Sequence, residues 1–382
     1  MKHPSKQPLY KMRYPVLEID LSKLCYNTGI ELGFFREHGI EVMGVNKVFN
    51  GMTETAEAIV QGGMKVVAES KIANLIKLKD LPCEKALLRN PGLSEISDVV
   101  KYADISLVTE IATIAALSKE AVKQNKIHKI LLMIDMGDLR EGIWFEEKAE
   151  METAVKKILE LPGIELYGLG TNFGCYGTVL ATEKNAAEFV SIAKELEEKL
   201  SIQFKYLSGG NCSSYRLVEQ GTMPKEINHL RIGAQQAFGI EYVEGRYLEG
   251  YRHSNKAIDQ YVSDAYILKA EIIELRRKPT VPVGELGMDS FMNAKVFVDR
   301  GIRKQAILSF GRQEVPWENI HPVDERIQVL GQTSNHTIID IEDTGDEYQL
   351  GDIVAFEIDY TALLYLCNST DIGKNFIADE YT

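Results

Sequence analysis

The chain has 382 residues, of which 45% are hydrophobic and 26% are charged. At about 100–200 residues per domain, this length predicts two domains with sizeable cores. The 43 basic and 56 acidic residues give a formal net charge of −13. This balance argues against nucleic acid as a partner, because neutralising phosphates requires a basic face.

The cysteines and the apolar runs further restrict the class of protein to which the chain can belong. Five scattered cysteines without a CxxC pair predict neither a disulfide framework nor a structural metal site. No apolar run approaches the roughly 18 residues of a membrane span, and the N-terminus has no signal-peptide core. We therefore expect a cytoplasmic protein without a metal or a membrane partner.

The first 245 residues alternate between strand and helix patterns. An opening β-rich run at 14–20 precedes a helix that should begin at an Asp or Ser cap, Asp20 or Ser22. Amphipathic stretches then separate eight short β-rich runs, at 41–46, 65–70, 85–90, 104–109, 129–135, 165–172, 204–209 and 229–233. This pattern predicts an α/β fold with a parallel (β/α)8 barrel over residues 1–245. A doubly wound open sheet is the competing arrangement.

The pattern changes in the last third of the chain. Alternating strands are expected at 265–275, 303–311, 326–334, 336–343 and 352–359, with turn residues between them. We predict a C-terminal, mostly antiparallel β domain over residues 246–382, with 245–263 as the connection.

In a (β/α)8 barrel, functional residues gather where the strands end. Lys47 follows the first barrel strand, and Arg140 lies in the turns after the fifth. The seventh ends in SGGNCSS (208–214), directly before a helical pattern, and the eighth offers Arg231, Gly233 and Ala234. Glycines and small polar residues before a helix allow backbone N–H groups to approach an anion.

Each of these signals has a purely structural alternative. Lys47 alone is also compatible with a surface lysine, and Arg140 with a salt bridge to Asp135 or Asp138. Together, a phosphate cup on strands seven and eight and a lysine across the barrel suggest a phosphate-bearing cofactor captured as a lysine imine.

These residues carry a family resemblance over nearly the whole chain. The segments DLREG, SGGN, KPTVPVGELGMD and YTALL form a specific set. With them, the sequence resembles the fold-type-III pyridoxal-phosphate enzymes of the alanine racemase family, and within it the ornithine racemase branch. The resemblance implies pyridoxal 5'-phosphate as cofactor and a barrel joined to a β domain.

The resemblance also implies residue roles. Lys47 would bind the cofactor covalently and transfer a proton, and Arg231 would contact the pyridine nitrogen. Arg140 would lie near the cofactor's phenolic oxygen and the substrate carboxylate. The phosphate would be held by Asn211, Cys212, Ser213, Gly233, Ala234 and Tyr360.

Several positions depart from the alanine racemase pattern. Met133 replaces the lysine that the family carbamylates beside its active-site arginine, and Asn172 replaces the histidine stacked on the cofactor ring. The opposite-face tyrosine is missing, and in its region the segment VGELGMDSF offers Glu285 or Asp289 as the second base. Ser334 and Asn335, followed by His336, replace the Met-Asp pair that contacts the substrate carboxylate. Asp289 and His336 are also compatible with structural roles, as are Cys175 and Tyr176 after strand six.

We therefore expect an enzyme that racemises a free amino acid, with ornithine as the best substrate. Lysine, another basic amino acid or alanine are the alternative substrates. Because Lys47 serves one face of the substrate, racemisation needs a second base on the other face. The resemblance implies that this base comes from a partner's β domain, and therefore a head-to-tail homodimer. A non-catalytic pyridoxal-phosphate carrier and a fold-type-III decarboxylase are the rival functions.

Overall fold

The computed structural model describes residues 13–239, 261–262 and 264–378. Nearly all of the expected connection at 245–263 lies outside these residues. The chain divides into two compact units, Asp20–Ala265 and a second unit that joins Met1–Ile19 to Tyr266–Ile377.

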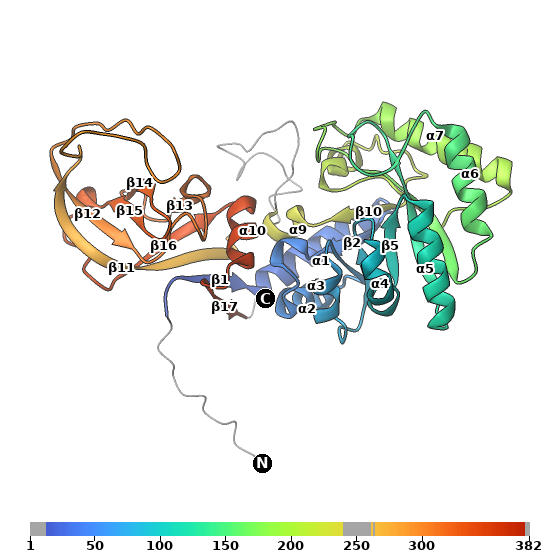
Figure 1. Cartoon of the computed structure of the whole chain (residues 1–382), viewed down its shortest axis with the longest axis horizontal. Coiled ribbons are helices and arrows are strands. Elements are labelled where there is room, and N and C mark those ends of the chain that lie inside the picture. The colour runs from blue at the N-terminus through green and yellow to red at the C-terminus, as the bar shows by residue number, and fades with distance from the viewer. Residues whose placement is uncertain (1–12, 240–260, 263, 379–382) are drawn as a thin grey trace, which may run out of the picture. The chain divides into compact units, whose positions relative to one another are not determined.

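The first unit is a closed parallel barrel of eight strands (Figure 1). The strands are β2 (Glu41–Val45), β3 (Val66–Glu69), β4 (Glu84–Leu87), β5 (Ile105–Val108), β6 (His128–Asp135), β8 (Ile164–Gly170), β9 (Tyr206–Ser208) and β10 (His229–Ile232). Pairing of β10 with β2 and of β5 with β6 closes the ring. This confirms the predicted barrel and its eight strands and excludes the open doubly wound sheet. A short strand, β7 (Ile143–Trp144), extends the sheet beside β6.

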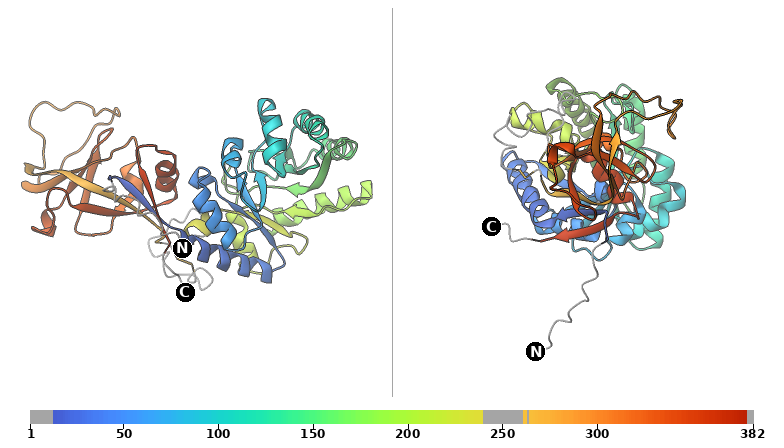
Figure 2. Two further views of the ribbon diagram at one scale, coloured as in Figure 1. Left: turned by 90° about the horizontal axis from the view of Figure 1, so that it is seen from below. Right: turned by 90° about the vertical axis from the view of Figure 1, so that its left-hand side faces the viewer.

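Helices cover the outside of the barrel, as the blue to green ribbons of Figure 2 show. They are α1 (Leu21–Glu37), α2 (Thr53–Gln61), α3 (Ile72–Lys77), α4 (Ile96–Tyr102), α5 (Ile111–Lys123), α6 (Lys148–Leu159), α7 (Glu183–Leu200), α8 (Tyr215–Glu219) and α9 (Ala234–Phe238). Asp20 caps α1 by accepting a 3.0 Å hydrogen bond from the backbone N–H of Lys23, which is one of the two caps predicted.

Alternation along the strands divides the core into two layers. The lumen of the barrel is filled by Met43, Leu107, Leu131, Met133 and other buried side chains. A larger cluster, including Leu132, Leu169 and Phe189, packs between the strands and the helices. Because the lumen is filled, the strand ends form the accessible surface at which a site can develop.

The second unit is antiparallel, as predicted. Its strands are β1 (Val16–Asp20), β11 (Tyr266–Pro279), β12 (Ile302–Leu308), β13 (Ile320–Pro322), β14 (Gln328–Gln332), β15 (Thr337–Asp340), β16 (Ile353–Ile358) and β17 (Gly373–Ile377), with helix α10 (Tyr360–Asn368). The central β11 pairs with β1 and β16 through its first half and with β12 through its second half.

The opening strand lies in a different unit from the predicted one, which placed all of residues 1–245 in the barrel. Residues 16–19 pair antiparallel with 266–269, so the opening strand belongs to the β unit. The reason is that Val16, Leu17 and Ile19 bury their side chains in a sheet whose other strands come from the far end of the chain.

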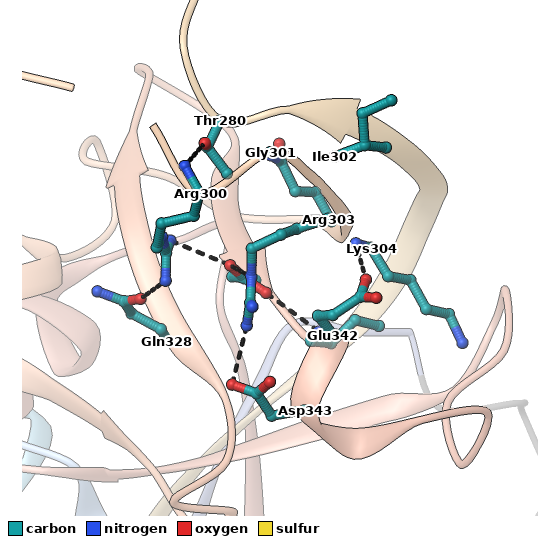
Figure 3. A network of polar contacts seen from close by, with 12 residues as sticks. Thr280, Arg300, Gly301, Ile302, Arg303, Lys304, Gln328, Glu342 and Asp343 are labelled. Carbon is teal, nitrogen blue, oxygen red and sulfur yellow. Dashed lines mark hydrogen bonds and ion pairs between the residues drawn. The ribbon is translucent and has the colours of Figure 1, made fainter. Parts of the chain in front are cut away.

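A long loop at 280–301 connects β11 to β12 (Figure 1). Its base is held by the network around Arg300 and Arg303 in Figure 3. The buried carboxylate of Asp340 accepts from Arg303 at 2.6 Å and pairs with Arg300 at 3.0 Å. The backbone N–H of Arg300 also donates to the Thr280 hydroxyl at 2.7 Å. The loop that carries Glu285 and Asp289 is therefore fixed at its root.

Candidate active site

The site is built at the carboxyl ends of β2, β6, β8, β9 and β10, which we call the carboxyl rim. Parallel strands in a closed barrel direct their carboxyl ends to one side, so residues that follow them meet there. Arg231 on β10 lies beside Met43 on β2 in the strand register, and Lys47 follows β2 directly. The structure thus brings the predicted barrel residues to one rim.

Lys47 begins a 3-10 turn, Lys47–Phe49, directly after β2. The preceding Asn46 is buried, donates to Glu69 at 3.1 Å and accepts from Thr55 at 2.9 Å. These contacts fix the backbone directly before Lys47, while the lysine side chain is exposed.

Arg231 is buried, and its guanidinium is held from two sides. Its Nη2 donates to the Thr171 carbonyl at 2.6 Å and to Asn172 Oδ1 at 2.7 Å, and its Nη1 donates to the Ser208 hydroxyl. Burial and the positive charge of Arg140 lower the pKa of Arg231 to about 10. The guanidinium therefore stays protonated at neutral pH and is a fixed donor.

His229 explains the orientation of Ser208. Burial, followed by the charge of Arg231, lowers the pKa of His229 to about 3, so the ring is neutral. Ser208 Oγ accepts from Arg231 and lies 2.7 Å from His229 Nδ1. Ser208 and Thr171 were not predicted as site residues. Their position directly before the Gly-Gly turn and before Asn172 is the signal that could have identified them.

The SGGN segment forms the expected turn before a helix. Gly210 has φ +123°, and a Cβ there would lie 2.4 Å from Ser214 Oγ, so glycine is required. Asn211 caps the following turn by accepting from the backbone N–H of Ser213 at 2.9 Å. Cys212 is buried, and its sulfur accepts from the backbone N–H of Gly233 at 3.5 Å. Asn211, Cys212, Ser213, Gly233 and Ala234 therefore lie together at the ends of β9 and β10.

Arg140 lies in the loop between β6 and β7, and it pairs with neither Asp135 nor Asp138, the partners of the purely structural alternative. Its Nε and Nη2 both donate to the carboxylate of Glu141. Asp135 instead accepts from the backbone N–H groups of Gly137 and Leu139 at 2.9 and 3.1 Å, and Asp138 binds backbone N–H groups of the loop after β8. Both aspartates are thus engaged in shaping turns, which leaves the neighbouring glutamate for Arg140.

The remaining predicted residues lie in the β unit. Tyr360 begins α10, which Asp359 caps at the backbone N–H of Ala362. Asn335 and His336 form the turn between β14 and β15, where the backbone N–H of Thr333 donates to the His336 carbonyl at 2.9 Å. Glu285 is exposed in the loop at 280–301.

Asp289 has a defined role in its own loop. Its Oδ1 accepts from the backbone N–H groups of Phe291 and Asn293, both at 2.9 Å. The hydrogen bond from the Asn293 backbone is the main reason why the pKa of Asp289 is lowered. This environment favours the turn role for Asp289 and keeps the carboxylate ionised.

The residues of the carboxyl rim fit a phosphate-bearing cofactor. Lys47, Arg140 and Arg231 supply three cationic groups. The hydroxyl of Thr171, at the end of β8, is buried without a hydrogen-bond partner among the described residues. A buried polar atom of this kind is normally satisfied by a ligand or by water. Across the described ranges, no group of His, Cys, Asp and Glu side chains is arranged to hold a metal ion.

The described helices include none that is long and apolar enough to cross a membrane. The fold of the chain is that of solved alanine racemases. Alanine racemase from Bartonella henselae with covalently bound pyridoxal phosphate superposes with a TM-score of 0.69 at 16% identity, over 96% of this chain and all of that one.

Sequence comparison assigns the family. The model of the alanine racemase N-terminal domain matches residues 19–236. The chain is 37% identical to ornithine racemase of Acetoanaerobium sticklandii over 95% of its length and all of that protein. It is 34% identical to lysine racemase of Thermotoga maritima over 95% of its length and 98% of that protein. This chain belongs to the alanine racemase family.

Proposed function

We propose that this protein is a pyridoxal-phosphate-dependent racemase that interconverts L- and D-ornithine. The observation that carries the proposal is that Lys47, Arg231 and the SGGN turn lie on adjacent strands of the carboxyl rim. The 37% identity to an ornithine racemase over nearly the whole chain supports both the reaction and the substrate.

In this proposal, Lys47 holds the cofactor covalently. Asn211, Cys212, Ser213, Gly233 and Ala234 hold its phosphate, together with Tyr360 of the β unit. When bound, pyridoxal phosphate withdraws electrons from the amino acid and acidifies its Cα proton. Arg231 would hold the ring nitrogen as a hydrogen-bond donor, and with its pKa of about 10 it would keep its own proton, which would limit side reactions.

The chain's own residues then bind the substrate and move its proton. Arg140 holds the carboxylate of the amino acid, and the amine of Lys47 takes or returns the Cα proton on one face. A second group must act on the other face. We assign this base to Glu285. Hydrogen bonds stabilise the ionised form of Asp289, which makes Asp289 the weaker base. Asp289 is better suited to pair with the terminal ammonium of ornithine. Asn335 and His336 complete the substrate contacts.

Both loop residues would reach the substrate in a head-to-tail homodimer. The loop at 280–301 exposes several large apolar side chains, and Val283 and Val296 are 95% and 94% exposed. Large apolar side chains gathered in one exposed loop are typical of protein–protein interfaces. We propose that a partner subunit covers this loop and that each loop completes its partner's site.

Lysine is the second candidate substrate, because the 34% identity to a lysine racemase is nearly as high and extends over the same share of the chain. We place the protein in the cytoplasm, in keeping with its five free cysteines.

The test is a panel assay. Purified protein with pyridoxal phosphate is incubated with each L-amino acid, and the D-form is measured by chiral chromatography. Ornithine should be converted fastest, and borohydride should attach the cofactor to the peptide that contains Lys47. Faster conversion of alanine or lysine would overturn the substrate assignment, and label on another lysine would overturn the role of Lys47.

A further inference from the structure

A continuous set of hydrogen bonds joins the two arginines of the site. Arg231 Nη2 donates to Asn172 Oδ1 at 2.7 Å, and Asn172 Nδ2 donates to Glu141 Oε1 at 2.9 Å. The same carboxylate accepts from Nε and Nη2 of Arg140. Because Asn172 accepts on one side and donates on the other, its amide has one orientation that satisfies both partners.

Glu141 is the carboxylate that balances these two cations. Burial alone would lower the pKa of Arg140, but hydrogen bonds to Glu141 and the neighbouring negative charges raise it above the ordinary value. At Arg231, burial and then the positive charge of Arg140 lower the pKa, and the negative charge of Glu141 opposes that change. Removing the charge of Glu141 would leave two guanidinium groups that repel each other.

In the described part of the chain, Glu141 is the carboxylate that pairs directly with Arg140, and Asp138 adds a negative charge without pairing with it. Met133 faces the lumen of the barrel at 0% exposure, and a Cβ at Gly170 would lie 2.9 Å from its sulfur and 3.7 Å from Arg231 Nη1. Its thioether is uncharged. Asp135 and Asp138 direct their carboxylates to backbone N–H groups. Glu141 is therefore the residue that pairs with Arg140 in this chain, where Met133 replaces the lysine that the family carbamylates.

We propose that Glu141 is a positioning residue that orients Arg140 for the substrate carboxylate and, through Asn172, couples Arg140 to Arg231 at the cofactor ring. The inference rests on the proposed function, since it explains what holds Arg140 and Arg231, the arginines proposed to bind substrate and cofactor. It predicts two separable effects, one on carboxylate binding through Arg140 and one on the cofactor through Arg231.

Glu141→Gln tests the first effect, because it keeps the size of the side chain and removes its charge. We expect KM for ornithine to rise about tenfold, as for the loss of one charge-assisted contact, with a smaller change in kcat. The affinity for butyrate, an unreactive carboxylate, should fall by the same factor when it is measured through the cofactor absorbance. Glu141→Asp should restore part of both. Glu150→Gln, an exposed carboxylate on α6, is the matched control and should change neither.

A double-mutant cycle shows whether Glu141 acts through Arg140. In an Arg140→Gln background, Glu141→Gln should cause no further loss of butyrate affinity. Asn172→Leu should shift the pH dependence of the cofactor absorbance while butyrate affinity stays within about twofold, because the pair of Arg140 and Glu141 remains. Equal losses in both backgrounds, or an unchanged affinity in Glu141→Gln, would overturn the inference. An unmutated protein that neither binds pyridoxal phosphate nor racemises amino acids would instead overturn the proposed function.

Discussion

The carboxylate of Asp138 accepts a 3.1 Å hydrogen bond from the backbone N–H of Cys175, 37 residues further along the chain. It also accepts from the backbone N–H groups of Tyr176 at 3.1 Å and Val179 at 3.3 Å. Asp138 is buried, whereas Cys175 and Tyr176 are exposed. One carboxylate from the loop after β6 therefore fixes the loop after β8 at the carboxyl rim.

Replacement of Asp138 by Asn should loosen that loop. The amide has one acceptor oxygen instead of two, and its NH2 group would face backbone donors. We expect the free energy of unfolding to fall by about 1–3 kcal/mol and the thiol of Cys175 to react faster with a thiol reagent. Denaturant unfolding and the labelling rate measure the two effects. An unchanged labelling rate would show that other contacts hold the loop, and Cys175→Ser identifies the labelled thiol.

Buried histidines predict a loss of stability in acid. Burial, followed by the charge of Lys126, lowers the pKa of His128 to about 4, and its Nε2 lies 2.9 Å from Ser106 Oγ. Since the unfolded chain binds this proton near its usual pKa of about 6.5, the stabilisation is present above that pH. It is lost as the pH falls toward 4, at a cost on the order of 3 kcal/mol.

His128→Gln should remove this part of the pH dependence. The glutamine does not titrate, so the free energy of unfolding between pH 6.5 and 4 should fall less steeply than in the unmutated protein. Urea unfolding at a series of pH values is the measurement. His321→Gln, at an exposed position, is the control, and an equal flattening in both variants would contradict the assignment.

The strands of the barrel could be predicted because each is a short β-rich run between amphipathic helices. Closure of the barrel is different: it depends on the pairing of Ile105 with Lys129 and of His229 with Glu41, and the strand pattern alone left an open sheet as an alternative. The membership of β1 could not be predicted for a similar reason. Val16 pairs with Lys269, and local sequence contains no information about a partner so far along the chain.

The residues of the rim were predictable where a residue type lies at or directly after the carboxyl end of a strand. Lys47, Arg231 and the SGGN turn all met this condition. The ion-pair partner of Arg140 could not be predicted in this way, because Asp135, Asp138 and Glu141 all lie within five residues of it. The choice among them depends on where the backbone N–H groups of 137, 139 and 175–179 point, which only the folded loop determines.

Asp340 offers a test of how the loop at 280–301 is held. Its side chain is 1% exposed and pairs with both Arg300 and Arg303. Asp340→Asn would leave two arginines without their shared charge, so we expect the free energy of unfolding to fall by about 1–3 kcal/mol. If the loop forms the dimer interface, the dissociation constant of the dimer should rise as well. Chemical denaturation and sedimentation measure the two quantities.

The matched control for this variant is Asp343→Asn. Asp343 pairs with the same Arg303 at 2.8 Å, but its side chain is 65% exposed. Solvent screening should limit its effect to about 0.5 kcal/mol. Equal losses in the two variants would contradict the view that the buried carboxylate anchors the loop.

Glu31 is a buried carboxyl group near Cys212, in the turn that follows β9. It lies on α1 at 0% exposure, and α1 packs against α9, the helix that follows Gly233. Neither carboxyl oxygen has a hydrogen-bond partner within the part of the chain that the structure describes. Burial raises the pKa of Glu31 well above its usual value, and the charge of Glu31 adds to burial in raising the pKa of Cys212.

The raised pKa of Glu31 predicts that stability falls as the pH rises. The folded protein holds the Glu31 proton more tightly than the unfolded chain, so this contribution is complete below about pH 4.3 and is lost as the pH rises through the raised pKa. Glu31→Gln should flatten the pH dependence, and Glu31→Met, which removes the unpartnered group, should increase the free energy of unfolding at pH 8 by about 1–3 kcal/mol. Denaturant unfolding from pH 5 to pH 9 measures both effects, with Glu37→Gln at an exposed position of the same helix as control. A Glu31→Met protein that is less stable than the unmutated chain at pH 8 would mean that the carboxyl group contributes a contact that the apolar side chain cannot replace.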